Sequence, residues 1–290
     1  MNTLPSGANV AGCDLEPPVP QVRRAVAVAL EEDLGVIGDV TSMCVVVEDS
    51  FVTAQFAARA DGVLAGTACA TEAYRQLDPT VTVAWSRHDG EPLTAGQVFG
   101  EVRGNTRSVL TGERVALNFL CHLSGVATLT RRYVRAVRGR ARVLDTRKTT
   151  PGLRSLERAA VRAGGGYNHR DSLSDAVLLK DNHLAVLGIA VAVERARDRW
   201  PGRMVEVECE DAEQVQAAIA AGADRILLDN MSLEDVKEAV TMVAGRAALE
   251  VSGGIDLDAV EAYAATGVDF FSFGALTHSA PVLDIGLDFP

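Results

Sequence analysis

Residues 204–230, MVEVECEDAEQVQAAIAAGADRILLDN, contain two short apolar segments on either side of an alanine-rich segment. MVEVEC (204–209) and DRILLD (224–229) have the length and aliphatic content of buried strands. DAEQVQAAIAAG (211–222) has helical composition and stops at a glycine, as helices commonly do. A strand, a helix and another strand in so short a segment predict a βα unit, in which the two strands run parallel.

The same alternation continues on both sides of this unit. Strand-like segments begin 34, 29, 20, 24 and 21 residues apart, a regular spacing that predicts successive βα units. The predicted strands are ARVLDT (141–146), DAVLLK (175–180), MVEVEC, DRILLD, ALEVSGG (248–254) and DFFSFG (269–274). The predicted helices between them are SLERAAVRAG (155–164), AVLGIAVAVERARDRW (185–200), DAEQVQAAIAAG, SLEDVKEAVTMVAG (232–245) and DLDAVEAYAATG (256–267).

Such a repeat suits either an α/β barrel or an open doubly wound sheet, and the residues at the strand ends help to choose between them. In chain order the strands finish on Thr146-Arg147-Lys148, Lys180, Glu208, Asp229, Ser252-Gly253-Gly254 and Gly274. A doubly wound sheet concentrates its ligand groups at one switch point, whereas a barrel gathers the ends of all its strands around one mouth. The distribution favours an incomplete, TIM-like α/β barrel of about six strands.

The residues before about position 110 have a different character. A helical segment, VRRAVAVALEEDLG (22–35), precedes β-rich stretches at 51–66 and 81–104. Asp61-Gly62, within the first stretch, predicts a hairpin turn. This pattern is typical of an α+β domain with an antiparallel sheet.

These differences predict two domains. We expect an N-terminal α+β open sandwich over residues 1–117 and an α/β barrel catalytic domain over 118–280. A long helical stretch at 108–138 joins them, and residues 281–290 are expected to pack with the first domain.

The chain of 290 residues is acidic, with a net charge of -11, but its charge is unevenly spread. Residues 101–180 hold 16 Lys and Arg against 6 Asp and Glu, whereas the rest of the chain holds 12 against 33. The overall acidity opposes binding to nucleic acid. No apolar run reaches the ~18 residues of a membrane helix. A basic centre in an acidic chain indicates a focused anion site.

The N-terminal segment and the cysteines point to the cytoplasm. The first twenty residues lack a basic start and an apolar region, so no secretion signal is expected. VAGC (10–13) matches a lipoprotein cleavage box, but without the preceding apolar region. The five cysteines include no CxxC pair, which favours reduced thiols over a disulfide framework or a zinc site.

Two adjacent cations, Arg147 and Lys148, stand at the end of the first predicted barrel strand, in LDTRKTTPGLR (144–154). If the strand ends converge, these cations join Lys180 beside the carboxylates Glu208 and Asp229. That mixture suits a ligand with several anionic groups together with hydroxyls or a divalent cation. Arg147 could instead pair with Asp145 or Asp229, but pairing alone does not account for two neighbouring cations.

Further polar segments adjoin the predicted mouth of the barrel. AGGGYNHRDSLSDAVLLKDNHL (163–184) offers His169 and Arg170 just before a strand. Glu206 and Glu208 share one strand face, since side chains alternate along a strand. Glu208 is expected to reach the mouth, whereas Glu206 either faces the mouth or neutralises a buried cation. SGGI (252–255) and FGALTHS (273–279) expose backbone N–H groups that suit a phosphate.

Taken together, several segments make the chain closely resemble the quinolinate phosphoribosyltransferase family. They are EEDLGVIGDVTS, GERVALNFLCHLSGVAT, DTRKTTPGLRSLERAAVRAGGGYNHRDSLSDAVLLKDNHL, ILLDNM, EVSGGI and FFSFGALTHS, all in the family's order. The resemblance implies that quinolinate and phosphoribosyl pyrophosphate give nicotinate mononucleotide, pyrophosphate and CO₂ in NAD biosynthesis. It also implies a homodimer whose active sites each borrow an arginine from the partner.

The resemblance further implies residue roles at matching positions. Arg114, from GERVALN, would be the borrowed cation. Thr146, Arg147, His169, Arg170 and Lys180 would bind quinolinate, and Lys148 would lie near the phosphoribosyl donor. Glu208 and Asp229 would address the ribose hydroxyls and Mg²⁺ carried by the donor, with no tightly bound organic cofactor. The 5'-phosphate site would be formed by Ser252, Gly253, Gly254, Phe273, Gly274 and Ala275, and the catalytic set by Lys148, Glu208 and Asp229.

Three alternatives remain at this point. One is a related phosphoribosyltransferase with another acceptor, as in molybdenum-operon homologues. A second is a Schiff-base aldolase that uses Lys180, although the surrounding cations exceed what that chemistry needs. A third is a non-catalytic anion-binding sensor.

Overall fold

The structure is a computed structural model that describes residues 15–289. The VAGC stretch therefore lies outside the described residues. Contacts along the chain divide it into two compact units. The first unit comprises residues up to Arg131, Thr149–Gly165 and the residues from Leu276 onward; the second comprises Arg132–Lys148 and Gly166–Ala275.

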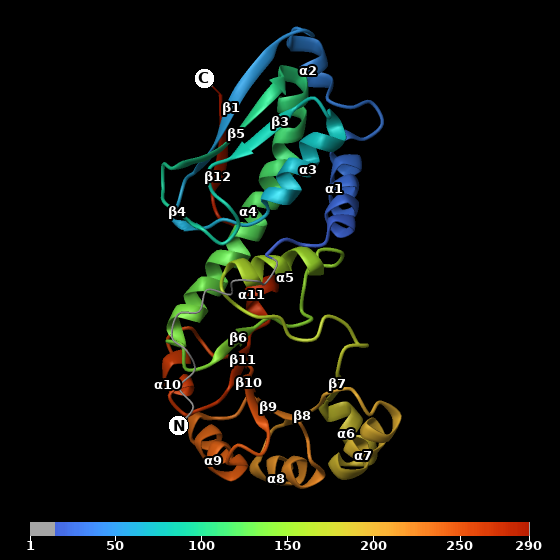
Figure 1. The fold of residues 1–290 in the computed structure, drawn as a ribbon, viewed down its shortest axis with the longest axis vertical. Coiled ribbons are helices and arrows are strands. Elements are labelled where there is room, and N and C mark those ends of the chain that lie inside the picture. Colours follow the sequence, from blue (N-terminus) through green and yellow to red (C-terminus); the bar gives the residue numbers. More distant parts are fainter. Residues whose placement is uncertain (1–14, 290) are drawn as a thin grey trace. The chain divides into compact units, whose positions relative to one another are not determined.

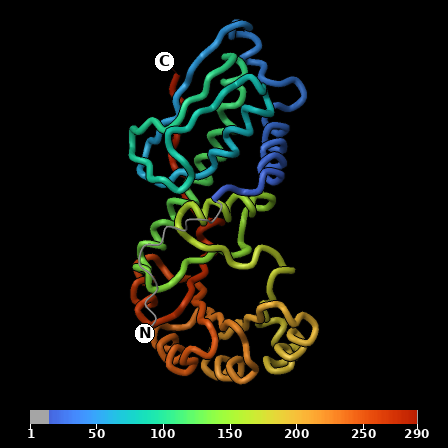
Figure 2. The backbone as a smooth tube through the Cα atoms, viewed as in Figure 1, coloured from blue at the N-terminus to red at the C-terminus, as the bar shows by residue number. Residues whose placement is uncertain are grey.

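An antiparallel sheet in the order β12-β1-β5-β3 forms the framework of the first unit. Its strands are β1 (Phe51–Ala58), β3 (Thr82–Trp85), β5 (Val98–Asn105) and β12 (Ile285–Asp288). The helices are α1 (Val19–Leu34), α2 (Val40–Val45), α3 (Thr67–Leu77), α5 (Arg154–Ala163) and the start of α4 (Thr106–Ala136). Figure 2 shows the red C-terminal strand among the blue and green N-terminal strands, in agreement with the pairing of β12 and β1.

The predicted hairpin at Asp61-Gly62 is wrong. β2 (Gly62–Val63) does not pair with β1 but with β4 (Pro92–Leu93). Both edges of β1 are already taken by β5 and β12, so the chain must leave that sheet after β1. The Asp61 carboxylate accepts a hydrogen bond from the N–H of Ala95 at 2.8 Å, which ties it to the β4 segment.

The second unit contains the parallel sheet that the repeat predicted. Its order is β6-β11-β10-β9-β8-β7, and all neighbouring strands are parallel. The strands are β6 (Arg142–Leu144), β7 (Val177–Leu179), β8 (Val205–Cys209), β9 (Arg225–Asp229), β10 (Ala248–Ser252) and β11 (Phe270–Ser272). β6 and β7 stand at the two ends of this order, so among the described strands the barrel stays open between them.

Helices follow the strands of this unit, and Figure 1 shows α7, α8 and α9 along one side of the sheet. They are α6 (Asp181–Leu187), α7 (Ile189–Arg199), α8 (Ala212–Ala221), α9 (Leu233–Val243) and α10 (Val260–Ala264). The last helix, α11 (Ala275–His278), follows β11 and belongs to the first unit from Leu276 onward. The single helix predicted at 185–200 is divided, because Gly188 has φ +69° and ends α6 before α7 begins. No helix within residues 15–289 combines the length and apolarity that crossing a bilayer requires.

The units are interleaved along the chain and cross more often than the predicted division, which placed residues 1–117 and 281–290 in one domain and 118–280 in the other. The first predicted boundary lies between residues 117 and 118. That boundary lies within α4, which is one continuous helix over Thr106–Ala136. The chain also returns to the first unit with α5 and again with β12, which pairs with β1. Interleaving of this kind leaves no local change in composition to mark each crossing.

Candidate active site

A cavity of about 370 Å³ lies at the carboxyl ends of the parallel strands, within the second unit. Nine of the residues predicted for the site line it: Thr146, Arg147, Lys148, His169, Arg170, Lys180, Glu208, Asp229 and Ser252. Four further residues complete the lining: Leu178, Leu227, Glu250 and Ser272. The strand ends therefore converge on one cavity, as expected for a barrel.

Strand register explains the four residues that were not predicted. Side chains two positions apart on a strand point to the same face. Leu178 precedes Lys180 by two positions, Leu227 precedes Asp229 and Glu250 precedes Ser252, so each shares its face with a predicted residue. Ser272 likewise precedes the predicted strand end Gly274 by two positions, so counting back by two from each predicted strand end would have found all four.

The cations of the cavity repel one another in the absence of an anion. Burial lowers the pKa of Arg170, and the nearby Arg147 guanidinium lowers it further. Lys180 donates a hydrogen bond from its ammonium Nζ to the Glu208 carboxylate, with the Glu208 side chain only 10% exposed. A ligand with two carboxylates would relieve the repulsion between Arg147 and Arg170. The cationic wall of the cavity, formed by Arg147, Arg170 and Lys180, is therefore suited to a dianion.

A turn with positive φ at Asn230 and Gly253 supports Asp229, one of the carboxylates that line the cavity. Asn230 has φ +53°, its side-chain amide donates to Asp229 at 2.8 Å, and its N–H donates to the carbonyl oxygen of Ser252 at 3.1 Å. Gly253 has φ +116° and lies so close that an added Cβ would be 2.5 Å from Asn230 Oδ1 and 3.0 Å from its N. The glycine is therefore required both by its backbone and by the approach of Asn230.

Gly253→Ala should disturb Asp229 without removing any charged group. We expect kcat/KM to fall by about 10-fold to 100-fold and the free energy of unfolding to fall by about 1–3 kcal/mol, from backbone strain and displacement of Asn230. Steady-state kinetics and denaturant unfolding measure the two effects. Gly202→Ala is a matched control, since its Cβ would meet no atom within 4 Å. Equal behaviour of the two variants would contradict this role for Gly253.

The predicted phosphate loops reach the cavity only in part. Ser252 lines it, whereas Gly253, Gly254, Gly274 and Ala275 are not among its lining residues. Phe273 differs from the expectation, because its N–H donates to the Leu144 carbonyl oxygen at 3.1 Å. Its buried ring lies 4.2 Å from that of Tyr133, centroid to centroid. Phe273 thus serves the core and offers no polar group to a phosphate.

Two other residues from the sequence analysis lie outside the cavity lining. Arg114 is exposed on α4, in the first unit. His183 is the third residue of α6, and its Nδ1 accepts a hydrogen bond from the N–H of Lys180 at 3.0 Å. His183 therefore caps the helix that follows Lys180 and fixes the backbone at that strand end.

Glu206 and Glu250 form a buried layer at the floor of the cavity, where Glu250 is also a lining residue, and both are 0% exposed. Nε2 of His169 lies 3.1 Å from Glu206 Oε2 and 3.4 Å from Glu250 Oε2. Arg225 donates to Glu250 at 2.9 Å, and its guanidinium stacks over the Phe270 ring at 4.3 Å. Glu206 was expected either to face the mouth of the barrel or to neutralise a buried cation. Its contact with His169 supports the second role.

This layer retains a proton at neutral pH. Burial acts to lower the pKa of His169, but the contacts with Glu206 and Glu250 outweigh it and raise the pKa to about 9. Burial raises the pKa of Glu206 as well. Both shifts describe the same tendency, since two buried carboxylates beside Arg225 need one more positive charge or proton to be neutral overall.

The free energy of unfolding should therefore depend on pH between the ordinary and the shifted pKa of His169. Below pH 6.5 the unfolded histidine is also protonated, so the stabilisation is fully present; it is lost as pH rises to about 9. The expected loss is roughly 3 kcal/mol, measured by denaturant unfolding at several pH values. Glu206→Gln should flatten this slope, and an unchanged slope in that variant would contradict the assignment.

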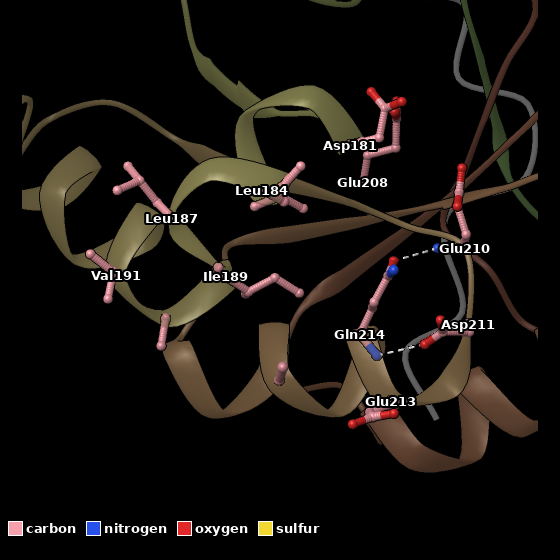
Figure 3. Close-up of a pocket in the computed structure, with 14 residues that line it drawn as sticks. Asp181, Leu184, Leu187, Ile189, Val191, Glu208, Glu210, Asp211, Glu213 and Gln214 are labelled. Carbon is pink, nitrogen blue, oxygen red and sulfur yellow. Dashed lines mark hydrogen bonds between the residues drawn. The ribbon is translucent and has the colours of Figure 1, made fainter.

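A second hollow in the second unit is larger than the candidate site but differs from it in charge. It has a volume of about 710 Å³ and lies between α6, α7 and α8 (Figure 3). Aliphatic side chains such as Leu184 and Ile189 form one side, and the other side carries five carboxylates: Asp181, Glu208, Glu210, Asp211 and Glu213. Neither Lys nor Arg lines this hollow, so its charge opposes an anionic substrate.

Comparison with known proteins matches two family models to successive parts of the chain. A family model described as the quinolinate phosphoribosyl transferase N-terminal domain matches residues 39–124, and the corresponding C-terminal domain model matches residues 126–288. The chain is 45% identical over 261 residues to a probable nicotinate-nucleotide pyrophosphorylase (carboxylating) of Bacillus subtilis, with 89% of each chain covered.

Two further relatives extend the similarity to almost the whole length. The nicotinate-nucleotide pyrophosphorylase (carboxylating) of Mycobacterium leprae is 42% identical over 286 residues, covering 96% of this chain and 99% of the relative. The solved structure of the Francisella tularensis nicotinate-nucleotide pyrophosphorylase superposes with a TM-score of 0.90 at 41% identity, covering 95% and 98% of the two chains. With both domain models matched and the strand-end cavity in place, the chain belongs to the quinolinate phosphoribosyltransferase family.

Proposed function

We propose that this enzyme transfers the phosphoribosyl group of phosphoribosyl pyrophosphate to quinolinate with decarboxylation, as a step of de novo NAD biosynthesis. The observation that carries the proposal is one cavity with a cationic wall of Arg147, Arg170 and Lys180, which Glu208 and Asp229 also line. Quinolinate bears two carboxylates on adjacent ring carbons, and planar guanidinium groups bind carboxylates through paired hydrogen bonds. Nicotinate, with one carboxylate, would leave part of this wall unneutralised.

The same charges account for the order of bond changes. As the bond between C1 of the ribose and pyrophosphate breaks, positive charge develops on the sugar and negative charge on the leaving group. Lys148, which lines the cavity, is proposed to stabilise the leaving pyrophosphate, and Glu208 or Asp229 to offset the charge on the sugar. The pyridine nitrogen bonds to C1 and becomes positively charged. The carboxylate on the adjacent ring carbon then leaves as CO₂, the electron pair of the broken C–C bond stays on that carbon beside the positive nitrogen, and a proton from solvent replaces the lost carboxylate. Ser252 and the following glycines are proposed to bind the 5'-phosphate.

Mg²⁺ is proposed to arrive with the donor substrate. Glu208 and Asp229 end neighbouring parallel strands and both line the cavity, a donor set that suits an ion which keeps most of its waters and takes one or two carboxylates. Among the described residues, the His/Cys/Asp/Glu cluster close enough for a protein cage is His169, Glu206 and Glu250, and it does not include them. When bound, the ion would supply positive charge beside the pyrophosphate.

A product assay tests the proposed function. Purified protein with quinolinate, phosphoribosyl pyrophosphate and Mg²⁺ should release CO₂ and pyrophosphate in equal amounts, and omission of Mg²⁺ should abolish both. Nicotinate in place of quinolinate distinguishes a relative with another acceptor, which would release pyrophosphate without CO₂. Binding of quinolinate with no product would indicate a sensor, and borohydride trapping of Lys180 with a carbonyl compound would indicate an aldolase.

A homodimer that shares its active sites is also proposed, with Arg114 entering the partner's cavity. Its exposure on α4 supports this role. Arg114→Ala and Arg147→Ala chains should each be nearly inactive alone. After mixing under conditions that exchange subunits, activity should return to about a quarter of the wild-type value, because half of the dimers would have one intact site. No recovery in confirmed mixed dimers would contradict the sharing. Localisation in the cytoplasm remains a prediction.

A further inference from the structure

His169 lines the cavity, but its ring nitrogens face the protein. Its Nδ1 accepts a hydrogen bond from the backbone N–H of Arg170 at 2.7 Å. On the other side of the ring, Nε2 lies 3.1 Å and 3.4 Å from the buried carboxylates of Glu206 and Glu250. The side chain is only 7% exposed. A substrate carboxylate could reach either nitrogen only by displacing one of these contacts.

The two contacts also define the form of the ring. An accepting Nδ1 carries no proton, so the ring proton is on Nε2, directed at the carboxylates. Both carboxylate oxygens of Glu206 are buried, and neither has a hydrogen bond of standard geometry within the part of the chain that the structure describes. Their polar contact is therefore the ion-pair distance to His169. The titration near pH 9 therefore belongs to the coupled group of His169, Glu206 and Glu250 as a whole. While Nδ1 accepts from Arg170, the extra proton of this group lies on the carboxylate side of the contact and the ring stays neutral.

We infer that His169 is a positioning residue that fastens the backbone of Arg170 to the buried carboxylates of β8 and β10, rather than a ligand of the substrate. Arg170 needs such an anchor because its guanidinium faces that of Arg147, and the two repel each other. The backbone N–H of His169 also donates to Asp145 at 2.8 Å, which fixes the same segment against the end of β6. This inference rests on the proposed function and departs from the role that the family resemblance implied for His169.

The anchor has consequences for substrate specificity. Arg170 also donates from Nη1 to the carbonyl oxygen of Ala176 at 3.2 Å, so the residue is held at its backbone by His169 and at its guanidinium by Ala176. The guanidinium of Arg170 then presents its remaining N–H groups in one orientation. This favours binding of a ligand whose two carboxylates are fixed at one angle on the same ring. Loss of the anchor should weaken quinolinate binding more than binding of the phosphoribosyl donor.

A double-mutant cycle tests whether His169 acts through Arg170. In His169→Gln the amide can reach the position of Nε2 but not that of Nδ1, so the buried carboxylates keep a partner while Arg170 loses its acceptor. We expect KM for quinolinate to rise about 10-fold, with KM for the donor nearly unchanged, and Arg170→Ala to raise it more. In the Arg170→Ala background, His169→Gln should then have less than a 2-fold further effect. The inference would be overturned if the effects of the two substitutions on KM for quinolinate multiplied in the double variant. It would also be overturned if His169→Gln raised KM for quinolinate and KM for the donor equally.

Nitrogen NMR of the histidine ring provides a readout that needs no turnover, with the His169→Gln spectrum as the assignment control. The expected signals are those of a protonated Nε2 and a bare Nδ1, unchanged when quinolinate is added. A ring protonated at Nδ1, or signals that shift on quinolinate binding, would contradict the inference. If the wild-type protein neither binds nor converts quinolinate, the proposed function fails. The signals measured without ligand still test the contact between His169 and the backbone of Arg170 independently.

Discussion

Arg147→Ala should lower kcat/KM for quinolinate by about 10³-fold. Removal of one partner from a desolvated charge pair typically costs 2–5 kcal/mol, and Arg147 stands at a strand end that the substrate dianion must approach. Arg147→Lys keeps the charge but not the planar fork, so it should lie between the wild type and the alanine variant. Initial rates at varied quinolinate, with saturating donor and Mg²⁺, measure the loss.

Arg132→Ala is the matched control for this prediction. Arg132 is exposed on α4 and belongs to the same basic segment of the sequence, but it does not line the cavity. Its replacement should leave kcat/KM within about 2-fold of the wild type. Full activity in Arg147→Ala, or an equal loss of activity in both variants, would contradict the proposed role of Arg147 in binding quinolinate.

Glu250→Leu should reduce the free energy of unfolding by about 3–5 kcal/mol, because it leaves the Arg225 guanidinium without its carboxylate in a buried layer. Arg225 is only 15% exposed and lies against the Phe270 ring, so water cannot replace the lost partner. Denaturant unfolding with a fixed m-value measures the change.

The double variant Arg225→Met/Glu250→Leu separates charge from packing. An apolar pair of similar volume often replaces a buried ion pair at little cost, so the double variant should recover most of the lost stability. Glu194→Leu, on the exposed face of α7, should change stability by less than about 0.5 kcal/mol. A double variant as unstable as Glu250→Leu would show that cavity formation, rather than an unpaired charge, causes the loss.

The parallel sheet could be predicted because its evidence is local. Each strand of the second unit is a short aliphatic run, and each is followed by its own helix, so the spacing alone predicted six strands. The residues that line the cavity followed from the same pattern, since the carboxyl ends of parallel strands converge. The break between α6 and α7 was missed even though Gly188 stood in the segment, because the apolar pattern continues across it.

Features that depend on distant residues could not be predicted in the same way. The partner of β2 is β4, because β1 already pairs on both edges, and no local turn signal contains that information. Phe273 stands in a run of small residues, but its N–H and ring are used by neighbouring strands and the core. Strand alternation places Glu250 on the inward face, whereas its pairing with Arg225 depends on the register of β9 and β10.

The most direct test is the structure of the enzyme with quinolinate and an inert analogue of phosphoribosyl pyrophosphate bound together. The cavity at the strand ends should hold both: the two carboxylates against Arg147, Arg170 and Lys180, with the sugar beside Glu208 and Asp229. His169 should keep its contacts with Arg170 and the buried glutamates. Ligands bound elsewhere, or an empty cavity whose cations contact only protein carboxylates at saturating concentrations of both compounds, would contradict the account.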